Sequence, residues 1–210
     1  MLRAAPATLA IAGVTIVVSL AVSLLGLENH AALYAGFMPA RAKLGLAGDV
    51  HGLVPNLLTP LTATLIHGGP LHLAMNMLLL GYTGVAAERA LGARGIVVLY
   101  LVGAYAAALG QWLPDPGSAT PMIGASGAIS AIVGAYALLY GRSRARAIGP
   151  IPAAVVNIAW LAAGWAAINI LVAWVAQSAG LGIAAGAHVG GFLAGLALMR
   201  PLLAWNWRSA

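Results

Sequence analysis

The sequence predicts an all-α integral membrane protein with six transmembrane helices. Of its 210 residues, 62% are hydrophobic and only 7% are charged, whereas a water-soluble domain carries about 25% charged residues. The few charged residues also fall at the ends of long apolar segments or in the loops between them. Both observations indicate that lipid is the solvent of this chain.

Six apolar segments account for most of the sequence. A helix needs about 20 apolar residues to cross the hydrocarbon core of a bilayer. The fourth segment is short by this measure, so we expect its outer end to begin below the membrane surface, inside the protein. We expect residues 1–210 to form a single domain, with short terminal tails and a long outer loop between the first two helices. The segments span about residues 7–26, 71–87, 95–113, 125–141, 153–175 and 184–204.

The basic residues predict how the chain is oriented. Six spans place both termini on one side of the membrane, and only Arg41 and Lys43 fall on the other side. Cytoplasmic loops are enriched in Lys and Arg, so we expect cytoplasmic termini, and we expect the membrane to be a bacterial inner membrane. This distribution also explains the net charge of +6 without a nucleic-acid partner. The arginines that share the side of the termini are Arg3, Arg89, Arg94, Arg142, Arg144, Arg146, Arg200 and Arg208.

Four polar residues fall at nearly one depth in the predicted bundle. Ser126 opens the fourth segment, His188 lies near the start of the sixth, and His72 and Asn76 share one face of the second. Counting from the cytoplasmic ends at 1.5 Å per residue places Ser126, His188 and Asn76 within about one helical turn of one another in depth. Polar residues inside a membrane are costly and usually functional.

The residue types indicate acyl-transfer chemistry. A serine hydroxyl becomes a useful nucleophile when an adjacent base takes its proton, and His188 is the candidate base for Ser126. A triad would add a carboxylate, but each of the four acids lies at a segment end or in a loop, so we expect a Ser-His dyad. The chain has no cysteine, which excludes a thiol nucleophile. The acids are Glu28, Asp49, Glu88 and Asp115.

The same region offers donors for a developing oxyanion, which needs hydrogen-bond donors fixed in advance. His72 and Asn76 supply side-chain N–H groups, and the backbone N–H near Ser126 supplies another. Gly124 and Gly127 permit the close backbone approach that a substrate carbonyl requires. We therefore assign the expected oxyanion hole to His72, Asn76, Ser126 and Gly124.

Small residues repeat at a spacing of four on the two helices that carry the expected dyad. Such faces allow helix backbones to approach closely in a membrane, which would bring the short side chain of Ser126 within reach of His188. Plain helix packing produces the same pattern. The repeats are Ser126, Ser130 and Gly134 on the fourth segment, and Gly182, Gly186 and Gly190 on the sixth.

Three motifs resemble those of the rhomboid family of intramembrane serine proteases. They are His67-Gly-Gly-Pro-Leu-His72-Leu-Ala-Met-Asn76, Gly124-Ala-Ser126-Gly127 and Gly186-Ala-His188-Val-Gly-Gly. The run Glu88-Arg89-Ala-Leu-Gly92 also resembles the turn after the family's second helix. The resemblance extends from about Leu57 to the end of the last span.

The resemblance implies a rhomboid-type bundle of six helices with a water-filled cavity that opens outward. It implies Ser126 as nucleophile, His188 as general base, His72 and Asn76 in the oxyanion hole, and His67 in a supporting role. Substrates would be single-span membrane proteins that enter from the lipid past the fifth helix, where Trp165 looks like part of the gate. We expect no cofactor and no metal.

One departure from the family leaves the orientation of His188 open. Four residues after the serine the family often has an aromatic residue that packs on the histidine, whereas this chain has Ser130. Ser130 is expected to pack between helices, with a hydrogen bond to His188 as the alternative. Asn157 and Asn169 on the fifth segment are expected to form hydrogen bonds between helices.

Three other functions are compatible with parts of the pattern. A catalytically silent rhomboid-like protein would bind membrane proteins without cutting them, but such proteins usually lack the serine or the histidine. A small transporter would show inverted repeats or intramembrane charges, and neither is evident in this sequence. A metal site at His67, His72 and His188 would usually include carboxylate or cysteine ligands, and none is placed to join them.

Overall fold

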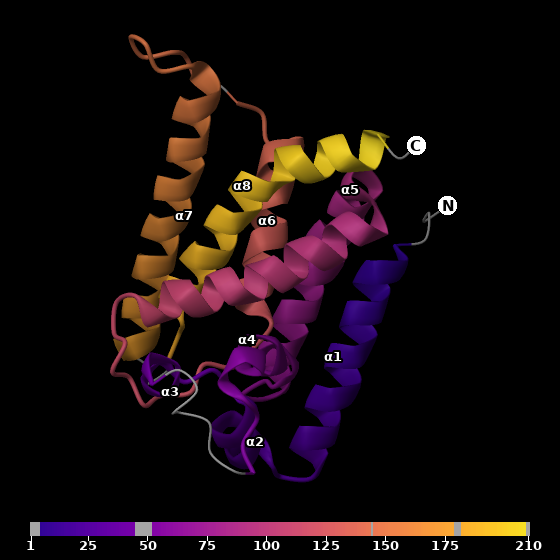
Figure 1. Cartoon of the computed structure of the whole chain (residues 1–210), viewed down its shortest axis with the longest axis vertical. Coiled ribbons are helices and arrows are strands. Elements are labelled where there is room, and N and C mark those ends of the chain that lie inside the picture. Colours follow the sequence, from indigo (N-terminus) through magenta and orange to yellow (C-terminus); the bar gives the residue numbers. More distant parts are fainter. Residues whose placement is uncertain (1–4, 45–51, 144, 179–181, 209–210) are drawn as a thin grey trace.

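The protein is an all-helical membrane protein. Its computed structural model describes residues 5–44, 52–143, 145–178 and 182–208. Figure 1 labels the helices and colours them along the sequence, from indigo at the N-terminus to yellow at the C-terminus. The α-helices are α1 Pro6–Leu24, α2 Glu28–Ala35, α3 Pro39–Lys43, α4 Thr59–Thr62, α5 Pro70–Trp112, α6 Ser126–Tyr140, α7 Ala153–Ser178 and α8 Ala185–Arg208, and short 3₁₀ turns η2 Asn56–Leu58 and η3 Ala63–Leu65 flank α4.

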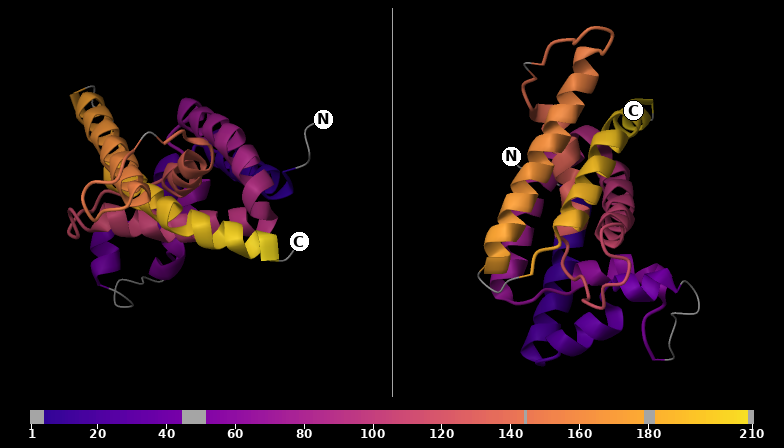
Figure 2. Two further views of the ribbon diagram at one scale, coloured as in Figure 1. Left: turned by 90° about the horizontal axis from the view of Figure 1, so that it is seen from above. Right: turned by 90° about the vertical axis from the view of Figure 1, so that its left-hand side faces the viewer.

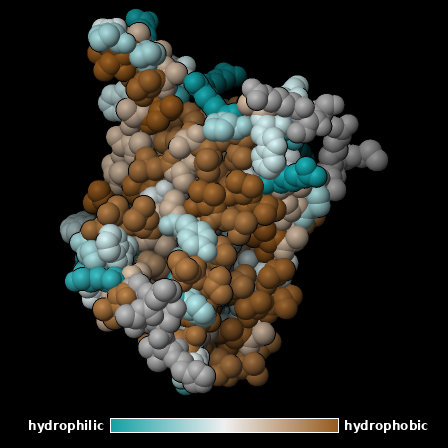
Figure 3. Space-filling view, in the orientation of Figure 1, coloured by the Kyte–Doolittle hydropathy of each residue, from teal (hydrophilic) through white to brown (hydrophobic). Residues whose placement is uncertain are grey.

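Four of the described helices, α1, α5, α7 and α8, are long and apolar enough to cross a membrane. Helix α6, with 15 residues, is shorter than the about 20 residues that a span requires. Large apolar side chains are exposed along these helices, among them Trp160, Ile170 and Trp174 of α7. Hydrophobic residues cover most of the face shown in Figure 3. The chain is therefore a multi-pass membrane protein.

Helix α5 is two helices joined at Gly92. Its 43 residues would measure about 65 Å if straight, twice the thickness of a hydrocarbon core. Gly92 breaks it with φ 73° and ψ 165°, a conformation that favours glycine. Gly68, just before α5, and Gln111, near its end, line one hollow, so the two ends of α5 lie together. The expected segments 71–87 and 95–113 are the two arms of this hairpin.

The core lies where α5, α6 and α8 pack together. Its fully buried side chains include Leu80 and Leu99 of α5 and Ile129 and Ile132 of α6. Close packing depends on glycine, because a Cβ on Gly191 of α8 would collide with backbone of α6. The small residues of α8 face two neighbours. Gly186 and Gly190 contact α5, whereas Gly191 and Gly195 contact α6.

Glu88 fixes helix α1 against the turn of α5. The buried carboxylate accepts hydrogen bonds from the backbone N–H groups of Ala7 and Thr8, at 3.0 and 2.8 Å, and from the Thr8 hydroxyl at 2.6 Å. These N–H groups lie in the first turn of α1 and have no partner within the helix. Asn206 near the end of α8 donates to the carbonyl of Ala90 at 3.1 Å. The start of α1 and the end of α8 therefore meet at the turn of α5.

Helix α7 lies at the edge of the bundle, where Figures 1 and 2 show it standing beside α8. Only three of its residues are buried, Val156, Asn169 and Ala176. Its main packing partner is α8. Most of its surface is therefore available to lipid.

The long loop between α1 and α5 supports the segment that leads to Ser126. Phe37, which follows α2, exchanges two backbone hydrogen bonds with Met122, at 2.7 and 3.0 Å. The N–H of Ala40 donates to the carbonyl of Ser118 at 2.9 Å. The sequence left the structure of residues 27–60 open, and within the described part this loop contains α2 and α3.

Candidate active site

Ser126 and His188 contact each other directly. Ser126 is the first residue of α6, and its Oγ lies 2.7 Å from Nε2 of His188 on α8. The two residues are 62 positions apart in sequence. They meet because α6 and α8 are in close contact, and the carbonyl of Gly127 occupies the space that a Cβ on Gly191 would fill.

The pair lies in a hollow of about 520 Å³. Its wall brings together Ser126 and His188 with His72 and Asn76 of α5. The predicted residues of the second, fourth and sixth segments therefore converge. The rest of the wall is formed by Gly68, Gln111, Thr120, Pro121, Met122, Ile123, Gly182, Ile183 and Ala184.

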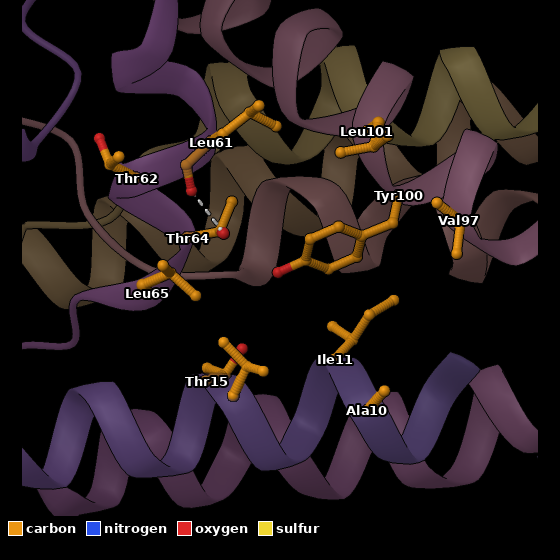
Figure 4. A pocket seen from close by; sticks show the side chains of 11 residues that line it. Ala10, Ile11, Thr15, Leu61, Thr62, Thr64, Leu65, Val97, Tyr100 and Leu101 are labelled. Carbon is orange, nitrogen blue, oxygen red and sulfur yellow. Dashed lines mark hydrogen bonds between the residues drawn. The ribbon is translucent and has the colours of Figure 1, made fainter. Parts of the chain in front are cut away.

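A second hollow, of about 360 Å³, lies between α1 and the elements α4, η3 and α5. Figure 4 shows the Tyr100 hydroxyl pointing into the space between Thr15 and Thr64, with apolar side chains around it. No imidazole or carboxylate lines this hollow. It therefore offers hydroxyl groups without a base to activate them.

His188 has a second partner that the sequence did not identify. Its Nδ1 lies 2.7 Å from Oδ1 of Asn169 on α7, and Asn169 is only 7% exposed. An amide on a lipid-facing helix suggested a hydrogen bond between helices, but nothing in the sequence indicated its partner. Trp165, one turn earlier, donates its indole N–H to the carbonyl of His188 at 3.0 Å and stacks on Phe192.

Ser130 is buried and contacts the backbone of its own helix. Its hydroxyl donates to the carbonyl of Ser126 at 2.7 Å, and its Cβ faces Gly191 of α8. The sequence allowed either packing between helices or a hydrogen bond to His188. The contact with Gly191 corresponds to packing between α6 and α8, and the hydroxyl hydrogen is used in the bond to the carbonyl of Ser126. At Nδ1 of His188 the bonded side chain is Asn169.

His72 and Asn76 lie one helical turn apart on the wall of the hollow. Nδ1 of His72 accepts the N–H of Gly68 at 3.3 Å. The amide nitrogen of Asn76 donates to the carbonyl of His72 at 2.8 Å. An amide nitrogen carries two hydrogens, so this bond uses one of them.

Gly124 has a different role from the one expected, and its place in the oxyanion hole is corrected. Its N–H donates to the carbonyl of Ala63 at 2.9 Å and is therefore not available to a substrate oxygen. Gly124 has φ +109°, and a Cβ there would lie 2.7 Å from Cε1 of His72. Glycine is needed here for its backbone conformation and for the close approach of the His72 ring.

His67 is buried behind the hollow, at 2% exposure. Its Nε2 accepts the N–H of Ala125 at 3.3 Å, and its Nδ1 lies 2.8 Å from the hydroxyl oxygen of Ser19 on α1. That hydroxyl donates to the carbonyl of Leu65 at 2.8 Å. Burial, and secondarily the nearby His72, lower the pKa of His67 to about 4, so the ring is neutral at pH 7. His67 therefore links α1 to the residue before Ser126.

Within the described ranges, no three His, Cys, Asp or Glu side chains gather closely enough to hold a metal ion. His67 and His72 are in ring contact, with centroids 4.9 Å apart, but at least one nitrogen of each ring has another partner. Nε2 of His67 and Nδ1 of His72 both accept backbone N–H groups. The wall of the hollow itself presents hydroxyl, imidazole and amide groups.

These features define a multi-pass membrane protein with a serine and a histidine in contact inside its helical bundle. Residues 55–205 match the Rhomboid domain. Because this match covers more than half of the chain, the protein belongs to the rhomboid family. It is 30% identical over 154 residues to RHOMBOID-like protein 4 of Arabidopsis thaliana, covering 69% of this chain and 35% of the relative. The chain thus spans about a third of the length of that relative.

Proposed function

We propose that this protein is an intramembrane serine endopeptidase that cuts single-span membrane proteins in or beside their transmembrane segments. The observation that carries the proposal is the 2.7 Å contact between the Ser126 hydroxyl and Nε2 of His188 in a hollow of about 520 Å³. Membership of the rhomboid family, most of whose members are proteases of this kind, supports it.

The reaction begins with proton transfer from Ser126 to His188. As Nε2 of His188 takes the proton, Oγ of Ser126 attacks the substrate carbonyl carbon and forms a tetrahedral oxyanion. His188 then protonates the departing amine, the C–N bond breaks, and an ester on Ser126 remains. Water entering the hollow loses a proton to His188, attacks that ester and releases the acid, which returns both residues to their starting states.

Three groups are placed to stabilise the oxyanion. The N–H of Ser126 is at the first position of α6, where it has no partner within the helix and where the helix dipole favours negative charge. Asn76 has a second amide hydrogen to donate. Because Nδ1 of His72 accepts from Gly68, the hydrogen of the neutral ring is on Nε2, which is the other donor.

The proposal includes a topology and an entry route. The α5 hairpin supports six membrane crossings, with α6 as a short span. Both termini are cytoplasmic, because most basic residues lie at their end of the bundle. Substrates enter past α7, and Trp165 forms part of the gate. Location in a bacterial inner membrane remains a prediction from the sequence.

Replacing Ser126 by alanine tests the nucleophile. A fluorescent fluorophosphonate should label the purified wild-type protein in detergent at neutral pH, and Ser126→Ala should remove the labelling without lowering the thermal unfolding temperature. Equal labelling of both proteins would contradict the mechanism. An unlabelled but folded wild-type protein would favour the alternative, a catalytically silent rhomboid-like protein that binds membrane proteins.

A further inference from the structure

We propose that Asn169 is the third member of the catalytic group, a positioning residue that fixes the tautomer and orientation of His188. This inference rests on the proposed function and concerns the same site. It assigns an active-site role to α7, and it explains how His188 is oriented although Ser130 stands where the family often has an aromatic residue.

The direction of the hydrogen bonds follows from the partner of the Asn169 amide nitrogen. That nitrogen donates to the carbonyl of Trp165 at 2.9 Å. A carbonyl only accepts, so the NH₂ group must face Trp165 and Oδ1 must face His188. An amide oxygen also only accepts. At the 2.7 Å contact between Oδ1 and Nδ1, the hydrogen therefore belongs to Nδ1 of His188.

This assignment leaves Nε2 of His188 with a free lone pair. A neutral imidazole carries one hydrogen, and here it is on Nδ1. Nε2 must then accept, and the group within its reach is the hydroxyl of Ser126 at 2.7 Å. The carbonyl of Trp165 thus fixes the orientation of the Asn169 amide, and that amide fixes the hydrogen of His188 on Nδ1. His188 therefore presents an unprotonated Nε2 to Ser126.

The position of Asn169 supports a dedicated role. It is one of only three buried residues on α7, and an amide in a membrane is costly unless it is hydrogen-bonded. An asparagine takes the place of the aspartate in Cys-His-Asn proteases. A neutral amide orients a histidine without placing a carboxylate in lipid.

Two variants of Asn169 separate positioning from packing. Asn169→Leu keeps the branched shape of the side chain but removes the acceptor, whereas Asn169→Asp keeps an oxygen acceptor. With a fluorophosphonate probe, Asn169→Leu should lower the limiting labelling rate about 100-fold with little change in the half-saturating probe concentration. Asn169→Asp should recover a rate within about tenfold of wild type. Asn157→Leu, on the same helix, should label at the wild-type rate.

Nitrogen-15 NMR of histidine-labelled wild-type protein in micelles tests the inference without catalysis. His188, assigned by its loss in folded His188→Gln, should give an Nδ1–H signal, which Asn169→Leu should remove or shift. A wild-type ring protonated at Nε2 would overturn the inference. So would wild-type labelling by Asn169→Leu, or an Asn169→Asp protein that is folded and as slow as Asn169→Leu. Failure of the proposed function would instead appear as labelling that survives Ser126→Ala.

Discussion

Gly124 brings two constraints together at one residue. Its φ of +109° lies in a region that L-residues with side chains rarely adopt, and the space beside its Cα is filled by the ring of His72. The peptide that precedes Ser126 is thereby held against α5. A side chain at this position would disturb the backbone and the imidazole together.

We expect Gly124→Ala to lower fluorophosphonate labelling by at least 10-fold. The new methyl group must displace His72, and the backbone strain costs about 1–3 kcal/mol. Labelling rate and thermal unfolding in detergent would be measured for both proteins. Gly164→Ala is the matched control, because nothing lies within 4 Å of the added methyl group, and it should behave as wild type. A fully active Gly124→Ala would show that His72 need not hold this position.

Residue types and depth were enough to predict that Ser126, His188, His72 and Asn76 would meet. They were not enough for Asn169, because apolar side chains surround α7 on all sides and the pattern does not show which face meets α8. The use of the Gly124 N–H was also unpredictable, because it depends on the carbonyl of Ala63, 61 residues earlier in the chain. Contacts that depend on tertiary placement cannot be read from local sequence.

Among the elements, α1 has its first turn held by a single side chain of α5. Glu88 accepts three hydrogen bonds from the first turn of α1, and a carboxylate at a helix N-terminus is also favoured by the helix dipole. Residues 55–205, which match the Rhomboid domain, do not include α1. This carboxylate therefore joins α1 to the family's core.

Replacing Glu88 by alanine should lower the free energy of unfolding by about 2–4 kcal/mol, since hydrogen bonds to a charged group contribute about 1.5–3 kcal/mol each and do not add fully. Unfolding in detergent, followed by circular dichroism, measures the loss. Glu28→Ala removes the carboxylate at the start of α2 and should change stability by less than about 0.5 kcal/mol. Equal effects of the two substitutions would mean that Glu88 does not anchor α1.

The helices themselves were largely predictable, because long apolar runs in lipid have few alternatives to the α-helix. The expected segments 125–141 and 153–175 correspond to α6 and α7 within a few residues. By its resemblance, the run 88–92 indicated a turn between 71–87 and 95–113, and α5 breaks at Gly92. The sequence did not show that the outer loop would contain α2 and α3. Short loop helices and the exact position of a backbone break are set by packing rather than by hydropathy.

For the whole molecule, the orientation in the membrane is testable because the chain has no cysteine. Ala119→Cys and Ser143→Cys each introduce one exposed thiol in a loop, and the proposed topology places them on opposite sides. A membrane-impermeant maleimide should label Ala119→Cys in intact cells but should label Ser143→Cys only after lysis. The reverse pattern would show that the orientation in the membrane is the opposite of the one proposed. Labelling of both variants in intact cells would contradict six spans.

Under the proposed function, the bond between Asn169 and His188 has a consequence for the timing of cleavage. Helix α7 is attached chiefly along α8, and few of its side chains are buried. If an arriving polypeptide wedges α7 outward, the amide leaves the imidazole and the ring is free to rotate. Hydrolysis would then wait until α7 has returned to its place beside α8. Admission of a substrate and cutting of its peptide bond would therefore alternate.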